Sequence, residues 1–303
     1  MNRQHISTLQ LALGAILISF SSVFVKLANM EPTAIGFYRM FIGGIILLAI
    51  ALFNKHKFFF GRKHFLLIIV CAFIFAADLF CWHQSIKLVG PGLATLIAAF
   101  QVFILASIGI IFHKEKLTLK LALGIPAALF GLYLLVGIKW SQTGVDYKWG
   151  VLFGLITAVT YACYVLFLNK SQNFQNSKIS NLALISLFCA LFLGVITLIQ
   201  KQSFMFADNT TLMAMISYGL VSQVIGWILI GNGIAKVPTS QIGLILLLQP
   251  IGSFLWDVIF FKRPTSGVEY LGLTIALIAI YLGSHARPVF AKATTRQATK
   301  PCQ

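Results

Sequence analysis

Two carboxylates stand inside long apolar stretches of this chain, Asp78 and Asp257. A charged side chain in the hydrocarbon region of a bilayer costs roughly 3 kcal/mol, so such a residue commonly faces a cavity or a polar partner. One interpretation is that these acids carry protons or hold the cationic end of a ligand. The alternative is a structural role, in which they pair with Arg39 or Lys87 or face a water-filled vestibule.

Aromatic side chains accompany both acids at helical spacing. Residues three, four or seven positions apart share one face of a helix. On this spacing Trp82 lies beside Asp78, and Trp256 lies beside Asp257. A carboxylate next to aromatic rings can hold an amine or ammonium group. Tryptophan is also common at bilayer interfaces, which would explain these positions without a ligand.

Two glutamines complete the pattern, since Gln101 and Gln249 each stand about 15 Å into an apolar stretch if that stretch is helical. A buried amide needs hydrogen-bond partners, which either a bound ligand or a neighbouring helix could supply. Arg39 is expected to pair with Glu31 or with a lipid headgroup. The candidate substrate-binding or coupling residues are Asp78, Trp82, Gln101, Tyr161, Gln223, Trp227, Gln249, Ser253, Trp256 and Asp257.

Composition places these residues in a membrane protein. Of the 303 residues, 59% are hydrophobic and only 10% are charged, and the mean hydropathy is +0.91. A soluble domain usually carries about 25% charged residues. The net charge of +16 does not indicate nucleic-acid binding, because the basic residues are spread through short loops and form no stripe with aromatic residues.

The sequence shows no catalytic or metal-binding motif. The five cysteines are scattered without a CxxC pair, so free thiols packed as small hydrophobes are expected. Nucleotide-binding loops, zinc motifs and nucleophile elbows are absent from the sequence. The expectation is therefore no catalytic residue, no metal and no cofactor. A membrane-embedded enzyme would need histidines and acids that converge at one interface, whereas His64, His83 and His113 are expected on two sides.

Ten apolar stretches are long enough to cross a bilayer, which requires about 20 residues in a helix. Each is expected to be an α-helix, because a backbone that crosses lipid must satisfy its own hydrogen bonds. The positive-inside rule favours cytoplasmic termini, since 15 of the 23 basic residues then lie inside. The predicted spans are 8–28, 34–53, 64–86, 91–112, 118–138, 149–168, 179–199, 212–234, 238–261 and 268–285.

The chain also contains an internal repeat. A shift of 148 residues places Val89 on Val237, Gln101 on Gln249 and Lys114 on Lys262. The shift equals five spans, and because five is odd the two halves enter the membrane from opposite faces. Inverted repeats of this kind bind their substrate near the membrane midplane, between the copies. The predicted organisation is a five-helix repeat over 1–140, a second over 141–290 and a disordered cytoplasmic tail over 291–303.

Several segments carry a family resemblance. The second span reads FYRMFIGGIILL, and the fourth and fifth read LATLIAAFQVFILASIGIIFHKEKLTLKLALGIPAALFGLYLL. Together with the five-plus-five arrangement, they resemble the EamA branch of the drug/metabolite transporter superfamily. The resemblance implies a central cavity surrounded by spans one, three, four, six, eight and nine. One departure is that the acidic residue after the fourth span, Glu115, has Arg263 as its counterpart, with Glu269 six residues later.

The combined interpretation is a secondary transporter that moves a small metabolite, an amino acid or an amine-like compound, by alternating access. Export is favoured, and coupling to protons through Asp78 is the preferred mechanism. Uptake of a cationic or quaternary-ammonium nutrient is the alternative, and a membrane-embedded enzyme or a scaffold is more distant. The expected partners are a small-molecule substrate, the lipid bilayer and protons, without nucleic acid. A bacterial inner membrane is the favoured location, and both a monomer and a homodimer remain open.

Overall fold

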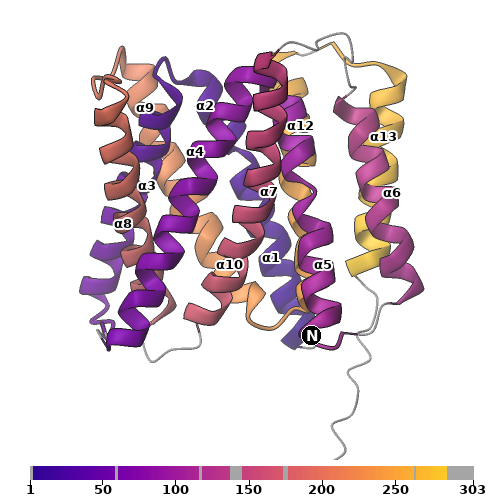
Figure 1. Ribbon diagram of the computed structural model, residues 1–303, viewed down its shortest axis with the longest axis horizontal. Coiled ribbons are helices and arrows are strands. Elements are labelled where there is room, and N and C mark those ends of the chain that lie inside the picture. Colours follow the sequence, from indigo (N-terminus) through magenta and orange to yellow (C-terminus); the bar gives the residue numbers. More distant parts are fainter. Residues whose placement is uncertain are drawn as a thin grey trace, which may run out of the picture.

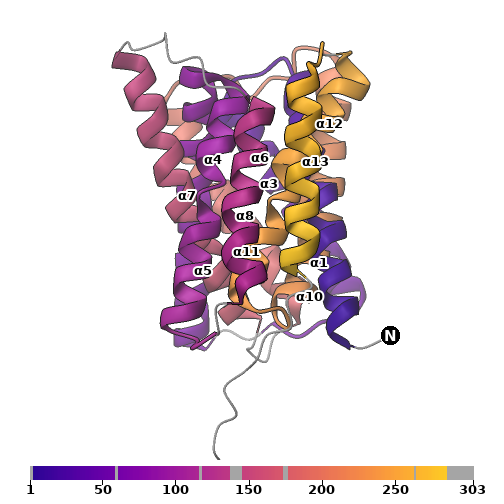
Figure 2. The same ribbon diagram turned by 90° about the vertical axis from the view of Figure 1, so that its right-hand side faces the viewer.

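The computed structural model describes residues 3–58, 61–115, 118–136, 145–172, 177–262 and 264–284. Every regular element in these ranges is helical, and the helices stand side by side in one bundle (Figures 1 and 2). The elements are α1 (Arg3–Ser19), α2 (Ser21–Leu27), α3 (Pro32–Phe53), α4 (Arg62–Ala98), α5 (Gln101–Ile111), α6 (Leu119–Val136), α7 (Val145–Ser171), α8 (Lys178–Ile199), α9 (Asn209–Ser217), the π-helix η1 (Tyr218–Gly226), α10 (Trp227–Ile234), α11 (Thr239–Leu246), α12 (Leu248–Phe261) and α13 (Gly267–Ser284).

The helical segments have the lengths that a membrane requires. Among the described residues, seven segments are long and apolar enough to cross a bilayer. Three shorter apolar helices accompany them, Gln101–Ile111, Leu119–Leu134 and Gly267–Gly283. The prediction of an all-helical membrane protein is therefore confirmed. We call the side where the N-terminus lies the N-face, at the lower edge of Figure 1, and the opposite side the far face.

Helix packing follows the internal repeat. Helix α4 of the first half packs against α7 of the second, and the equivalent elements η1 and α10 of the second half pack against α1 of the first. The pair α3 and η1 likewise matches the pair α8 and α4. Contacts of α3 with α8, of α5 with α11 and of α6 with α13 join equivalent elements of the two halves. The contact pattern maps onto itself when the halves are exchanged, as two inverted five-helix repeats require.

The two halves also end their helices in the same way. The non-glycine residues with positive φ, among those described, are Lys55 (51°), Lys114 (53°), Lys201 (55°) and Lys262 (51°). They follow α3, α5, α8 and α12, respectively. A left-handed residue closes the last turn of a helix, and a positive charge there is favourable beside the free carbonyl groups. Lys114 and Lys262 are repeat equivalents. The two halves therefore share a left-handed lysine at this helix end in addition to their pattern of apolar residues.

Three of the expected spans are broken near their middle, which the apolar pattern did not predict. The first is interrupted at Phe20, the fourth at Ala99 and Phe100, and the ninth at Leu247. At the last two sites the backbone tightens, with Phe100 N donating to Ile97 O and Leu247 N to Leu244 O. Such irregular backbone is tolerated at membrane depth where it is buried in protein or lines a cavity. Ala99 and Leu247 are repeat equivalents, so this break belongs to the shared architecture.

Other boundaries also differ from the prediction. Helical hydrogen bonding continues from α4 past Gly90 and Pro91, where a helix end was expected. The expected eighth span contains the π-helix η1, and such a bulge is frequent at functional sites. Helices α6 and α13 pack against each other at one edge of the bundle (Figure 1). The predicted boundary between residues 140 and 141 and the predicted tail 291–303 lie outside the described residues.

Candidate functional site

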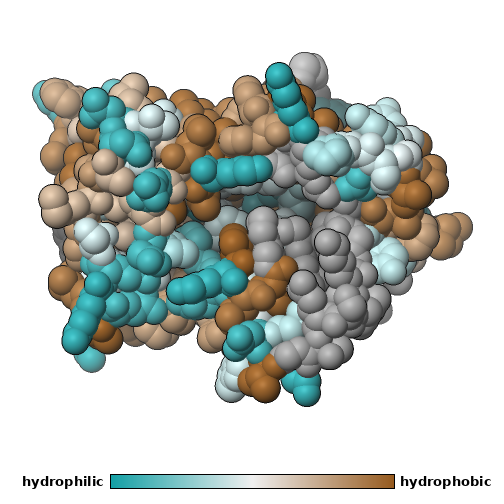
Figure 3. All heavy atoms as spheres, turned by 90° about the horizontal axis from the view of Figure 1, so that it is seen from above, coloured by the Kyte–Doolittle hydropathy of each residue, from teal (hydrophilic) through white to brown (hydrophobic). Residues whose placement is uncertain are grey.

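A cavity of about 570 Å³ lies between the two repeats. Its wall comes from spans of both halves, and the far face of the molecule is hollowed near its centre (Figure 3). Seven of the ten predicted site residues line it: Asp78, Trp82, Gln101, Tyr161, Trp227, Gln249 and Ser253. The structure thus brings side chains that are up to 175 positions apart in sequence, Asp78 and Ser253, to one concave surface.

The other three predicted residues lie differently. Gln223 is fully buried and contacts Arg39 rather than the cavity. Trp256 donates a hydrogen bond from Nε1 to Ser19 Oγ (2.7 Å) and stacks on Phe20, so it supports the break between α1 and α2. The side chain of Asp257 lies outside the described residues.

Arg39 is part of the cavity wall, and the expected pairing with Glu31 or a headgroup is wrong. Glu31 precedes the first turn of α3, and Arg39 lies eight residues, or about 12 Å, deeper along the helix. Its side chain is only 4% exposed. Nε donates to Gln223 Oε1 (3.2 Å) and Nη1 donates to the Tyr218 hydroxyl (3.1 Å).

The π-helix η1 places these partners of Arg39. Gly43 of α3 faces Gln223, and a Cβ added at Gly43 would lie 2.5 Å from Gln223 Cγ. Gly219 of η1 approaches α3 in return, since a Cβ there would lie 3.0 Å from Gly43 N. Two glycines therefore let the helices approach closely enough for Tyr218 and Gln223 to reach the guanidinium group.

Asp78 is the acidic group of the cavity. It is 3% exposed and accepts a hydrogen bond from Thr160 Oγ1 (3.3 Å). Within the described residues it forms no ion pair with Arg39 or Lys87. The expected structural pairing is therefore not formed, and a fixed positive group and an acid line the same cavity separately.

Aromatic rings form the floor of the cavity. Phe75 stacks on Tyr164 with ring centroids 3.9 Å apart, and Trp227 packs edge-on against both rings. The Tyr161 hydroxyl accepts a hydrogen bond from Gln249 Nε2 (2.8 Å), which joins α7 to α12. Two buried polar atoms of the wall, Gln101 Oε1 and Trp227 Nε1, have no hydrogen-bond partner. Groups of this kind are unusual in folded proteins, and they often mark a place where water or a ligand binds.

Sequence reasoning missed several wall residues. Phe75 and Phe254 are ordinary apolar residues of apolar helices, and no local signal distinguishes them from lipid-facing phenylalanines. Arg39 carried a usable signal, which was its depth in α3. No group of three histidine, cysteine or acidic side chains that could hold a metal occurs in the described residues.

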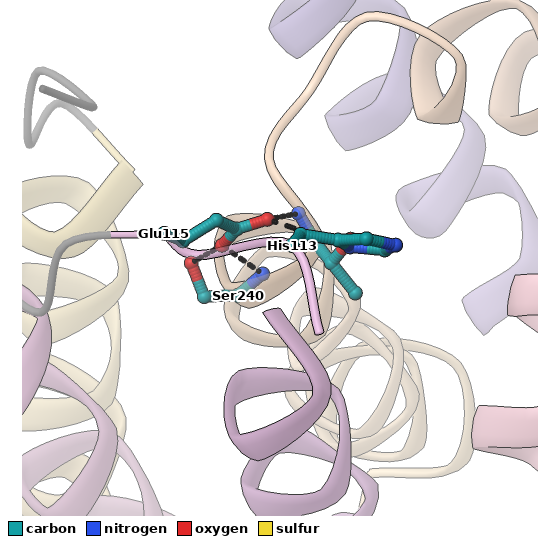
Figure 4. Close-up of polar contacts among 4 residues, drawn as sticks. His113, Glu115 and Ser240 are labelled. Atoms are coloured by element: carbon teal, nitrogen blue, oxygen red, sulfur yellow. Dashed lines mark hydrogen bonds and ion pairs between the residues drawn. The ribbon is translucent and has the colours of Figure 1, made fainter. Parts of the chain in front are cut away.

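The N-face is closed where α5 meets α11. Glu115 accepts hydrogen bonds from Thr239 N, Ser240 N and Ser240 Oγ, and His113 lies beside it (Figure 4). Glu115, which the sequence marks only as an acid without an acidic repeat counterpart, thus contacts the opposite repeat directly.

Inverted helical repeats that enclose a polar cavity at membrane depth define a transport protein of the multi-pass membrane class. The chain belongs to the EamA-like transporter family, whose model matches residues 5–137 and 148–284. A known structure with 16% sequence identity superimposes with a TM-score of 0.76 over 92% of this chain and 98% of that one. That similarity supports the fold alone.

Three relatives of this chain carry transport names. The chain is 23% identical over 274 residues to an "Uncharacterized transporter" of Archaeoglobus fulgidus, which covers 90% of this chain and 94% of that protein. It is also 23% identical to a "Probable amino-acid metabolite efflux pump" of Salmonella typhimurium over 215 residues, 68% of this chain and 71% of that protein. An Escherichia coli protein of the same description is 23% identical over 202 residues, 63% and 66% of the two chains.

Proposed function

We propose that this protein is a secondary transporter that exports an amino acid or a closely related amine-bearing metabolite by alternating access. The observation that carries the proposal is the pair of opposite charges, Arg39 and Asp78, which line one cavity without pairing with each other. A cavity of this kind is complementary to a small zwitterion.

Arg39 is the proposed site for the substrate carboxylate. Its guanidinium group has five N–H donors, of which two are used by Gln223 and Tyr218. The remaining donors can hold a carboxylate in a planar, two-point contact. Because Phe75 and Tyr218 also pack against the guanidinium group, Arg39 is held in place before the substrate arrives.

Asp78 is the proposed site for the substrate amine. Trp82 and Tyr161 line the cavity with it, and aromatic faces stabilise an ammonium group. Apolar residues of the same wall, among them Leu79, Ile86 and Phe254, would contact the substrate side chain. In this arrangement a proton on Asp78 and the substrate ammonium compete for one carboxylate, which would couple transport to a proton gradient.

Export is proposed because two relatives are described as amino-acid metabolite efflux pumps. The distribution of basic residues supports cytoplasmic termini, so the N-face would be cytoplasmic and the cavity would open outward. The proposed location is a plasma membrane such as a bacterial inner membrane, and the proposed activity is transport without catalysis.

Uptake of a quaternary-ammonium nutrient remains the second candidate. It is favoured by the aromatic floor of Phe75, Tyr161 and Trp227, because such rings can surround a methylated ammonium group. A ligand without a carboxylate would not need a guanidinium group held in place by Gln223, Tyr218 and Phe75. A zwitterion would use that group to bind its carboxylate.

Substrate-dependent thermal shifts with a panel of amino acids, decarboxylated amines and quaternary ammonium compounds separate these candidates. The proposal expects shifts with amino acids only, followed by flux in proteoliposomes that responds to a pH gradient. Asp78→Asn should lose both the shift and the response. Asp146→Asn, in the exposed first turn of α7, is the matched control and should keep both. A quaternary-ammonium shift that survives Arg39→Gln would favour the quaternary-ammonium substrate instead.

A further inference from the structure

A single carboxylate joins the two repeats on the N-face. Glu115 follows α5 in the first repeat, whereas its hydrogen-bond donors begin α11 in the second. Thr239 N donates to Oε1 (2.8 Å), and Ser240 donates to Oε2 from both N (3.1 Å) and Oγ (2.6 Å) (Figure 4). The Glu115 side chain is only 7% exposed. Charge-assisted hydrogen bonds of a buried carboxylate are among the stronger polar contacts in proteins.

The local chain conformation directs Glu115 toward the opposite repeat. Lys114 adopts a left-handed conformation (φ 53°), and Glu115 N donates to Gly109 O (3.0 Å), which turns the chain back over the end of α5. A Cβ added at Gly109 would lie 2.5 Å from Glu115 Oε2. Position 109 must therefore be glycine if the carboxylate is to lie where it does. His113 Nδ1 lies 2.9 Å from Thr239 Oγ1, which adds a second side-chain contact between the two repeats at this place.

Behind this contact the seam between α5 and α11 is tightly closed. A Cβ added at Gly243 of α11 would lie 3.1 Å from Val102 Cα and 3.2 Å from Leu105 Cβ. Val102 and Leu105 are both 0% exposed. Any passage from the cavity to the N-face along this seam requires α5 and α11 to separate, and that separation breaks the hydrogen bonds of Glu115.

The positions equivalent to this contact carry residue types that cannot reproduce it on the far face. Under the shift of 148 residues, Arg263 takes the place of Glu115, Asp257 the place of Gly109, and Pro91 the place of Thr239. Arginine has no acceptor atom, proline has no backbone N–H, and aspartate carries the side chain that the glycine position excludes. Each of the three differences removes a part that the Glu115 contact needs.

We propose that Glu115 is a one-sided lock, which holds the N-face gate closed and biases the empty protein toward the state open at the far face. The inference rests on the proposed alternating access, because a lock needs a gate that opens. Glu115 acts by positioning α11 against α5 and does not contact the substrate.

Cysteine accessibility tests the lock without any substrate. The reporter is Val102→Cys in a chain whose native cysteines are replaced, and its rate of reaction with a maleimide measures separation of α5 and α11. We expect Glu115→Gln and Glu115→Ala to raise this rate about tenfold or more, which corresponds to roughly 1.4 kcal/mol in the opening equilibrium. Gly109→Ala, which displaces the carboxylate, should raise it similarly.

Glu269→Gln is the matched control. Glu269 also accepts a hydrogen bond from a backbone N–H at a helix start, from Ser266 N (2.7 Å), but both residues belong to the same repeat. We expect no change in the labelling rate of the Val102→Cys reporter in this variant. If the Glu115 variants do not yield monodisperse protein, Ser240→Ala carries the test, because it removes one of the three hydrogen bonds and should raise the rate by a smaller factor.

An unchanged labelling rate in folded Glu115→Gln and Ser240→Ala variants would overturn the lock, as would an equal rise in Glu269→Gln. These outcomes are independent of the proposed substrate. If amino acids fail to bind but the labelling rate rises in the Glu115 variants, the proposed lock is supported and the proposed function is wrong.

Discussion

Gln249 and Gln101 occupy equivalent positions of the two repeats but have different partners. Gln249 donates to the Tyr161 hydroxyl at 2.8 Å, whereas Gln101 Oε1 is buried without a partner. Both residues directly follow a break in their span, at Leu247 and at Ala99, and both line the cavity. The repeat therefore supplies the same amide twice, and the surrounding side chains give one amide a structural contact and leave the carbonyl oxygen of the other without a partner.

The two amides should respond in opposite ways to substitution. Tyr161→Phe leaves the Gln249 amide without its acceptor, so we expect a loss of about 1 kcal/mol in stability and a lower Tm. Gln101→Leu removes an unpaired buried acceptor, so stability should be unchanged or higher, while substrate-dependent stabilisation falls. Thermal unfolding with and without substrate measures both effects. A large loss of Tm in unliganded Gln101→Leu would contradict the assignment.

Substitution of Arg39 should weaken the binding of ligands that carry a carboxylate more than the binding of ligands that lack one. Lysine keeps the charge but cannot reproduce the planar fork of a guanidinium group, so Arg39→Lys should weaken amino-acid binding about tenfold or more. Binding of the corresponding decarboxylated amine should change much less. Isothermal titration with the two ligands provides the measurement, and equal losses for both would argue against a carboxylate at Arg39.

The close approach of α3 and η1 gives a test of packing. Gly43→Ala would place a Cβ 2.6 Å from Gln223 Cβ, so we expect a loss of about 1–3 kcal/mol in stability and weaker substrate binding through displaced Arg39 contacts. Gly267→Ala is the matched control, because a Cβ there meets no atom within 4 Å. Alanine at that helical position should leave stability unchanged or raise it by about 1 kcal/mol. Similar Tm values for the two variants would contradict this packing.

The lysines that end α3 and α8 should be replaceable with a gain in stability. Lys55 and Lys201 have φ values of 51° and 55°, a conformation that costs an L-residue more than it costs glycine. Relief of the left-handed conformation, about 1–2 kcal/mol, outweighs the lost charge interaction at the helix end, about 0.3–1 kcal/mol. Lys55→Gly and Lys201→Gly should therefore each raise stability by about 0.5–1 kcal/mol in thermal or denaturant unfolding. Lys87→Gly, at an exposed position in the interior of α4, is the control and should lower stability by about 1 kcal/mol.

The class of fold follows from the amino-acid sequence alone. Ten apolar stretches and a repeat shifted by an odd number of spans require helices in two inverted copies, because lipid leaves the backbone no other partner. Helical spacing also identified seven residues that line the cavity, since a polar side chain in an apolar helix must face something other than lipid.

Which polar groups contact one another depends on how the helices pack in three dimensions. Apolar periodicity carries no signal for the breaks at Phe20, Ala99 and Leu247, because an apolar run reads the same whether its helix is continuous or interrupted. At Phe20 a distant helix contributes, since Trp256 Nε1 donates a hydrogen bond to Ser19 Oγ beside the break. The contacts of Arg39 with Gln223 and of Glu115 with Ser240 join residues that are 184 and 125 positions apart. Sequence supplies the charges, but their separation within the cavity and their pairing across the N-face result from how the two halves pack.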